Sequence, residues 1–147
     1  MSYEFKITRR VEFSETDMAG IVHFSNYYRY MEAAEHGFFR SLGFSIVTQE
    51  TDPPVGWPRV HASFDFKHPL HFEDEFEVHL LVSEKRSRSL TYLFKINRLG
   101  GDEPVECATG RLTVVCVIKN EQGKMAAAPI PADVSAKIEV APTEMTE

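Results

Sequence analysis

The first thirteen residues alternate between apolar and polar side chains, which is the pattern of a half-buried strand. The apolar positions share one parity: Tyr3, Phe5, Ile7, Val11 and Phe13. Because successive side chains of a strand point to opposite faces, one face of this segment can pack on a core while the other meets solvent. We therefore expect a strand that ends near Phe13.

The hydrophobic period changes after residue 24. Apolar residues now recur every three or four positions, at Tyr27, Met31, Ala34, Phe38 and Leu42. This spacing predicts a helix over residues 25–42 with one apolar stripe and a length of about 27 Å at 1.5 Å per residue. Ser25 or Asn26 can cap its start, and Gly43 can end it.

The two-residue period returns after a segment rich in proline and glycine, Thr51–Pro58, which we expect to form a loop. Four strands are predicted beyond it, over residues 60–66, 76–82, 90–96 and about 103–118. Short turns join the last three, so these should run antiparallel. Gly110, inside the longest strand, predicts a β-bulge.

One strand, one long helix and four further strands predict an α+β fold, in which a single antiparallel sheet packs on one helix. A chain of 147 residues fits one domain. We expect this domain to span residues 1–147, with a core over about 3–120 and a C-terminal extension over about 121–147. Prolines at 129 and 131 and the short stretch 132–138 predict that the extension is loosely attached.

The charge of the chain argues against several classes of partner. The formal net charge is -6, so the protein has no general attraction to nucleic acid or to an anionic membrane. The N-terminus lacks the apolar core of a signal peptide, and no apolar stretch approaches the roughly 20 residues that span a bilayer. We therefore expect a cytoplasmic protein, and we interpret Cys107 and Cys116 as small core residues rather than a disulfide.

The segment between the first strand and the helix, residues 15–27, carries the strongest chemical signal. It combines a carboxylate, Asp17, with a glycine and the start of a helix. Unpaired amides at a helix start, near Phe24 and Ser25, can stabilise an oxyanion on a thioester carbonyl, and Asp17 can attack that carbonyl or activate water. The alternative interpretation is that Asp17 only caps a turn or balances the helix dipole.

This segment also carries a family resemblance. The run Glu15-Thr16-Asp17-Met18-Ala19-Gly20-Ile21-Val22, followed by Phe24, Asn26 and Tyr27, resembles the signature D-x-D-x-x-G-x-V of the 4-hydroxybenzoyl-CoA thioesterase family. The likeness continues through residues 61–64 and 84–89. It implies a hotdog fold and hydrolysis of an acyl-CoA, with aromatic acyl groups such as hydroxybenzoyl or hydroxynaphthoyl as candidates. It also implies a homodimer with sheets paired edge to edge, or a homotetramer.

The resemblance assigns roles to individual residues. Asp17 falls on the catalytic acid, and the backbone amide of Phe24 falls on the oxyanion donor. Substrate contacts are expected from Gly20, His23, Tyr27 and His61. The chain departs from the pattern in two places: Glu15 occupies the first acidic position, and Phe24 occupies the position where related bacterial thioesterases have a histidine. His23 lies one residue earlier, which changes the direction of its side chain, so we assign it to the pocket and not to catalysis.

The only compact basic cluster consists of Lys85, Arg86 and Arg88, between two predicted strands. Arginine suits phosphate oxygens, and the resemblance places the phosphate contacts of coenzyme A in this segment. Coenzyme A is then part of the substrate, and no separate cofactor is expected. His68 and His71 lie across Pro69 without a second ligand pair of zinc-like spacing, so no metal site is expected either.

Two other functions remain open at this stage. A hotdog dehydratase or hydratase acting on a β-hydroxyacyl thioester would use a histidine and an acid, and His23 is the residue that suggests it. A non-catalytic acyl-CoA-binding module would keep the fold and the basic cluster. The choice between a nucleophilic and a general-base role for Asp17 is also open, as is the identity of the acyl group.

Overall fold

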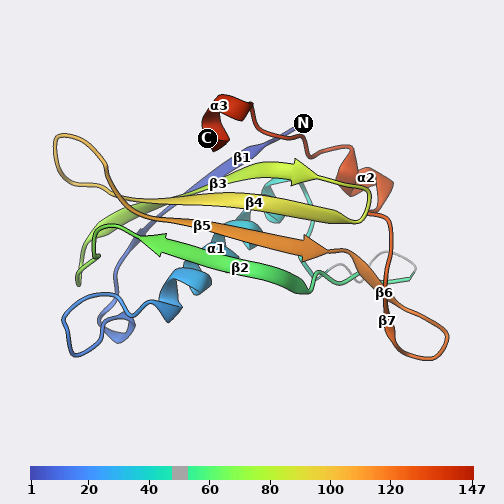
Figure 1. The fold of residues 1–147 in the computed structure, drawn as a ribbon, viewed down its shortest axis with the longest axis horizontal. Coiled ribbons are helices and arrows are strands. Elements are labelled where there is room, and N and C mark those ends of the chain that lie inside the picture. The colour runs from blue at the N-terminus through green and yellow to red at the C-terminus, as the bar shows by residue number, and fades with distance from the viewer. Residues whose placement is uncertain (48–52) are drawn as a thin grey trace.

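The computed structural model describes residues 1–47 and 53–147 and is built around one five-stranded antiparallel sheet (Figure 1). The strand order is β1-β3-β4-β5-β2, and every neighbouring pair is antiparallel. The strands are β1 (Glu4–Arg10), β2 (Arg59–Phe66), β3 (Glu75–Lys85), β4 (Ser89–Arg98) and β5 (Val105–Val115). The first and second strands along the chain thus form the two edges of the sheet.

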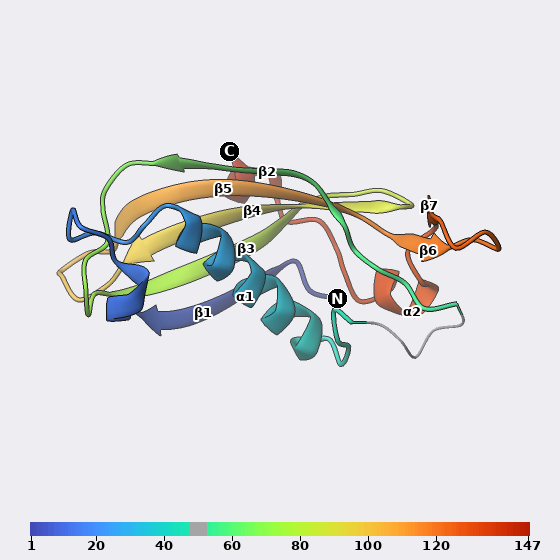
Figure 2. The same cartoon turned by 90° about the horizontal axis from the view of Figure 1, so that it is seen from below.

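The long helix α1 (Ser25–Ser41) lies in the concave face of the curved sheet (Figure 2). Its buried stripe includes Met31, Ala34 and Phe38, as the spacing predicts. The stripe meets the alternate residues of the central strands, such as Phe76 and Tyr92, which are also fully buried. The α+β hotdog arrangement expected from the sequence is confirmed, with the helix beginning at Ser25 and with Leu42 at its C-cap.

Two strand boundaries differ from the predictions. The first strand ends at Arg10, and Phe13 belongs to a short 3-10 helix, η1 (Phe13–Glu15), where it is 75% exposed. The predicted long strand breaks at Cys116: β5 stops at Val115, and β6 (Val117–Lys119) pairs instead with β7 (Met125–Ala127) in a separate hairpin. Alternation of apolar residues continues through the break, which is why the sequence pattern did not reveal it.

The predicted bulge at Gly110 is wrong. Gly110 pairs regularly with Phe64 on one side and Phe94 on the other, whereas the register shifts at Cys107, between the pairs Ile96–Ala108 and Asn97–Glu106. A Cβ atom on residue 110 would lie 2.5 Å from a ring carbon of Phe64. Glycine is therefore required there for the close approach of an aromatic ring, which is a second common reason for glycine within a strand.

The prediction of a loosely attached C-terminal piece is also wrong. Val134 in α2 (Ala132–Ser135) and Ile138 are buried in the main core. Lys85 Nζ donates hydrogen bonds to the carbonyls of Ser135 and Ile138, both at 2.8 Å. The last turn, α3 (Thr143–Thr146), lies on the convex face of the sheet. The extension is attached by apolar contacts and by hydrogen bonds from a lysine to carbonyls far away in the sequence. A local pattern of residues in the sequence does not reveal such contacts.

A buried ion pair connects α1 to the edge strand β2. Glu35 is 0% exposed, and both of its oxygens accept hydrogen bonds from the guanidinium of Arg59, at 2.5 and 3.3 Å. Arg59 also donates to Glu32 at 3.2 Å and to the carbonyl of Trp57 at 3.0 Å. Burial raises the pKa of the Glu35 carboxyl, and the facing Arg59 charge opposes this shift. The two cysteines are free and buried, as their interpretation as core residues requires.

Candidate active site

Residues 15–22, which we call the signature loop, form a tight turn around Asp17. The amide of Gly20 donates to the Asp17 carbonyl at 2.9 Å, and the amide of Asp17 donates to the Ile21 carbonyl at 3.0 Å. Gly20 has φ +81°, a conformation that favours glycine over any other residue. Asp17 Oδ1 accepts from the Ala19 amide at 2.9 Å. One carboxylate oxygen therefore orders the turn, and the side chain is held in place without being buried.

The start of α1 leaves one backbone amide available. Neither predicted side-chain cap forms: His23 Nδ1 interacts with Ser25 Oγ at 2.7 Å and accepts from the Ser25 amide at 3.3 Å, while Asn26 Nδ2 donates to the Glu15 carbonyl at 2.8 Å. The amides of Asn26 and Tyr27 donate to the carbonyls of His23 and Phe24. Within residues 1–47 and 53–147, the Phe24 amide has no acceptor. It is the donor that a developing oxyanion at this helix start would meet first.

Asp17 and Phe24 line one cavity of about 430 Å³, which we call the Asp17 pocket. It lies between the signature loop, the start of α1 and the segment that follows β2. The remaining lining residues are Ile21, Val22, Tyr27, Phe66, Lys67, His68 and Pro69. The lining thus includes one carboxylate, a residue whose amide is free, several apolar side chains and two basic side chains, which suits a ligand with an apolar group next to a polarised carbonyl.

Tyr27 forms the inner aromatic wall of the Asp17 pocket. Its side chain is nearly buried and its ring meets that of Phe66 edge to face, with centroids 4.9 Å apart. Burial raises the pKa of Tyr27 to about 12, with the neighbouring Cys107 thiol adding to the shift and a backbone hydrogen bond with Leu70 opposing it. At neutral pH the phenol is therefore uncharged and can act as a hydrogen-bond donor but not as a base.

Sequence reasoning did not identify Phe66, Lys67 and His68 as pocket residues. They enter the pocket because the chain turns at the end of β2, where the amides of Lys67 and His68 both donate to the Cys107 carbonyl, at 2.8 and 3.2 Å. Lys67 Nζ also contacts Glu106 Oε1 at 3.0 Å. The only available signal was the pair of basic residues before Pro69 at a strand end, and this pair could not be located relative to Asp17 without the tertiary fold.

The other residues assigned to substrate contacts lie outside this pocket. Gly20 shapes the signature loop behind Asp17, and His23 faces Ser25 and the ring of Phe24, whose centroid is 4.7 Å away. His61 lies on β2 and interacts with Ser63 Oγ at 3.2 Å. Because its neighbours Ala62 and Phe64 face the helix, His61 points to the opposite side of the sheet. Of the four, only Tyr27 lines the pocket within one chain.

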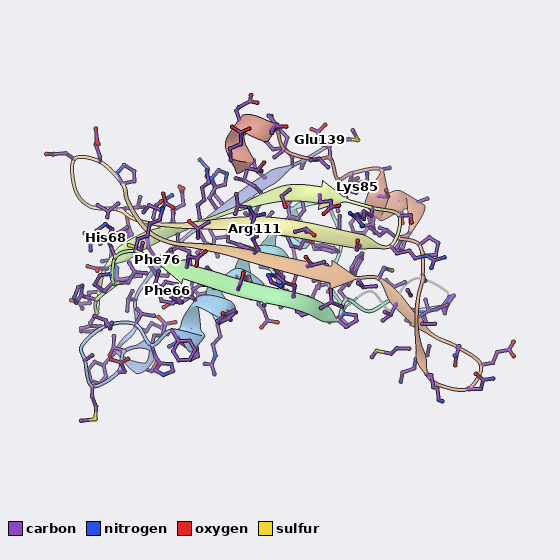
Figure 3. All side chains as sticks on the ribbon, viewed as in Figure 1. Phe66, His68, Phe76, Lys85, Arg111 and Glu139 are labelled. Atoms are coloured by element: carbon purple, nitrogen blue, oxygen red, sulfur yellow. The ribbon has the colours of Figure 1, made fainter. Side chains whose placement is uncertain are left out.

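Lys85, Arg86 and Arg88, which we call the basic hairpin, lie at the opposite end of the sheet from His68 and Phe66 (Figure 3). The signature loop is joined to the other end, through the Val22 amide and the Leu70 carbonyl at 2.8 Å. The 11 residues of β3 separate these ends by roughly 33 Å at about 3.3 Å per residue. Lys85 binds carbonyls of the C-terminal segment, Arg86 Nε contacts Glu84 at 2.5 Å, and Arg88 is exposed.

No group of three or more metal-ligating side chains is assembled in the described part of the chain. His71 approaches Asp74 at 3.6 Å, and His68 lines the Asp17 pocket instead. Among the described residues, no helix is long and apolar enough to cross a membrane.

Comparisons with known proteins point to one family. Residues 11–138 match the model of the thioesterase-like superfamily. A putative esterase of Aquifex aeolicus is 37% identical over 125 residues, which cover 85% of this chain and 91% of the relative. The 4-hydroxybenzoyl-CoA thioesterase of Pseudomonas sp. (strain CBS-3) is 27% identical over 90% of this chain and 96% of its own. The structure of a gentisyl-coenzyme A thioesterase superposes with a TM-score of 0.74 at 32% identity, covering 88% of this chain and 98% of the other.

Proposed function

The chain belongs to the thioesterase-like superfamily, and we propose that it hydrolyses an acyl-CoA at the Asp17 pocket. The protein is a thioester hydrolase, as its named relatives are. The observation that carries the specific proposal is that one cavity is lined by both Asp17 and Phe24, the residue whose backbone amide has no acceptor within residues 1–47 and 53–147. These are the two groups that attack on a thioester requires: a base or nucleophile, and a donor for the oxyanion.

The reaction follows from this pairing. The thioester carbonyl oxygen accepts a hydrogen bond from the Phe24 amide, which stabilises the negative charge that develops as the carbonyl carbon becomes tetrahedral. Either the Asp17 carboxylate adds to that carbon and water later cleaves the resulting anhydride, or Asp17 takes a proton from water as the water oxygen adds. In both routes the carbon–sulfur bond breaks, and the products are the free acid and coenzyme A. The Asp17 oxygen not used by Ala19 is the one available for either role.

An aromatic acyl group fits the pocket wall. The rings of Phe24, Tyr27 and Phe66 line the cavity, and aromatic rings favour offset or edge-on contacts with one another. The uncharged Tyr27 phenol and the imidazole of His68 can offer hydrogen bonds to a ring hydroxyl. Hydroxybenzoyl-type substrates, like those in the names of two relatives, are therefore the first to assay.

Binding of the coenzyme A phosphates by the basic hairpin requires a second subunit. Within one chain, Arg86 and Arg88 lie at the far end of β3 from Asp17, roughly 33 Å away at about 3.3 Å per residue. The edge strand β2 exposes Val60 and Phe66, which are 63% and 50% accessible, and an exposed apolar edge favours pairing with another chain. A two-fold antiparallel pairing of β2 would reverse the partner's sheet and bring its hairpin end toward Asp17.

Asp17→Asn tests the catalytic assignment. The substitution keeps the size of the side chain and an oxygen for the Ala19 amide, so the fold should persist while kcat for thiol release falls more than about tenfold, equivalent to about 1.4 kcal/mol of barrier. Asp102→Asn, at an exposed position in the turn between β4 and β5, is the matched control. Retention of more than a tenth of kcat would remove Asp17 from the mechanism. Formation of an unsaturated acyl-CoA would favour a dehydratase, and binding without turnover would favour a non-catalytic acyl-CoA module.

Arg86→Ala combined with Arg88→Ala tests the phosphate site. KM for an acyl-CoA should rise, more at low salt, while an acyl-N-acetylcysteamine thioester that lacks the nucleotide should be unaffected. Arg40→Ala combined with Arg111→Ala, at two exposed arginines, removes the same two charges and serves as the control for net charge. Equal losses of kcat/KM with both substrates would place the arginines in folding or general electrostatics.

The assembly has its own test. Light scattering at micromolar concentration should give the mass of at least a homodimer, and a tetramer would agree with the family expectation. A monomer mass would contradict both the assembly and the composite phosphate site.

A further inference from the structure

A second cavity lies between α1 and the edge strand β2. Its volume is about 170 Å³, and its lining comprises Tyr28, Arg29, Met31, Glu32, Arg59, Ala62 and Leu112. Phe66 lines the Asp17 pocket and Ala62 lines the second cavity. Phe64 occurs between them on the same face of β2, because side chains two apart on a strand share a face. On the helix side the same boundary runs between the neighbours Tyr27 and Tyr28.

The ring of Phe64 is held at this boundary from three directions. Phe66 stacks on it with centroids 6.0 Å apart, and Tyr28 meets it edge to face at 5.2 Å. Below the ring, β5 carries Gly110, where a Cβ atom would approach Phe64 to 2.5 Å. The ring therefore occupies the space that any other residue at position 110 would fill. Such a seated aromatic side chain has few alternative rotamers, so it forms a fixed wall.

Phe64 itself lines neither cavity, but its ring packs against Tyr27 and Phe66 on one side and Tyr28 on the other. We propose that Phe64 is a specificity-determining residue that separates the Asp17 pocket from the second cavity and so limits the acyl group to a compact one, such as a single substituted ring or a short chain. The inference rests on the proposed acyl-CoA thioesterase function and specifies its substrate class. A longer linear acyl chain is excluded because Phe64 blocks its path into the second cavity. With the Phe64 ring in place, the acyl group does not reach the second cavity.

Replacing Phe64 by smaller residues should shift the selectivity toward longer acyl chains, and more so for the smaller replacement. Phe64→Leu and Phe64→Ala are assayed for thiol release with benzoyl-CoA, butyryl-CoA and octanoyl-CoA. The ratio of kcat/KM for octanoyl-CoA over benzoyl-CoA should rise by about tenfold or more in Phe64→Ala and by less in Phe64→Leu, the range that hydrophobic pocket contacts commonly discriminate. Phe13→Ala, at an exposed phenylalanine whose ring packs on Phe72 and not on the aromatic residues of either cavity, should leave the ratio unchanged.

A further variant separates passage into the second cavity from general loosening. Ala62→Leu places a larger side chain in the second cavity, so adding it to Phe64→Ala should cancel the gain with octanoyl-CoA while benzoyl-CoA hydrolysis continues. Circular dichroism verifies that each variant is folded, and Phe64→Leu carries the test if Phe64→Ala fails to fold.

The outcomes test the proposed function and the role of Phe64 separately. A wild-type protein that releases no thiol from any acyl-CoA refutes the proposed function. An active wild-type protein whose Phe64 variants keep the same octanoyl-to-benzoyl ratio refutes the role of Phe64 alone. If the double variant Phe64→Ala, Ala62→Leu keeps the gain with octanoyl-CoA, the role of Phe64 is also refuted, because the octanoyl chain would then bind outside the second cavity.

Discussion

Arg59→Leu should destabilise the protein strongly and in a pH-dependent manner. The substitution removes both guanidinium donors to the Glu35 carboxylate, which is 0% exposed and has no other donor among the described residues. It therefore leaves an unpaired charge in the core. Breaking a buried pair in this way typically costs about 3–5 kcal/mol, whereas the intact pair contributes little net stability because desolvation offsets its attraction.

The loss of stability in Arg59→Leu can be estimated by assuming that the buried Glu35 carboxylate takes up a proton in the variant. From the ordinary pKa of 4.5, protonation at pH 7 costs about 3.4 kcal/mol, at 1.36 kcal/mol per pH unit. The folded-state pKa of this acid is raised above its unfolded value, so the folded state binds the proton more tightly. The loss of stability should therefore be small near pH 4.5 and grow as the pH rises toward the folded-state pKa. At pH 5 it should be below about 1 kcal/mol.

Urea unfolding followed by fluorescence provides the measurement, because the single tryptophan, Trp57, is buried and its carbonyl accepts from Arg59. Wild type and variant are compared at pH 5, 6 and 7 and at equal protein concentration, since any assembly would add to the apparent stability. Arg29→Leu is the control for loss of an exposed arginine. A cost that does not change with pH, or one below about 1 kcal/mol at pH 7, would refute the reasoning.

Three further predictions concern stability. Gly37→Ala should lower the free energy of unfolding by about 1–3 kcal/mol, because its Cβ would lie 2.6 Å from the ring of Phe5; an unchanged urea midpoint would show that the ring moves freely. Lys85→Met should increase proteolysis after residue 130, because two carbonyls of the C-terminal segment lose their donor; a digestion pattern identical to wild type would contradict this. Gly20→Ala should strain the turn by about 1–2 kcal/mol, since φ is +81°, and should lower kcat through Asp17; normal kcat would show that the turn tolerates the strain.

Local patterns in the sequence determined the elements and the signature loop. The three-to-four residue period placed α1 within one residue at its end, and the two-residue periods placed the central strands β3 and β4. These predictions succeed because burial of one face depends on periodicity over a short stretch of chain. The Asp17, Gly20 and helix-start combination is local in the same sense, since the hydrogen bonds of Asp17, Gly20 and Asn26 join residues 11 or fewer apart. Only the bond between the Val22 amide and the Leu70 carbonyl joins this loop to a distant segment among the hydrogen bonds described above.

Features that join distant parts of the chain were decided by the tertiary structure. Lys67 and His68 enter the Asp17 pocket only because β2 ends beside the start of α1, and Glu35 can be buried only because Arg59 reaches it from a strand 24 residues away. The C-terminal segment is held by Lys85 across 50 residues. The basic hairpin is distant from Asp17 for the same reason, since strand direction, and not sequence separation, determines which end of a sheet a turn occupies. Such contacts depend on which elements meet in space, and a one-dimensional pattern carries no record of that.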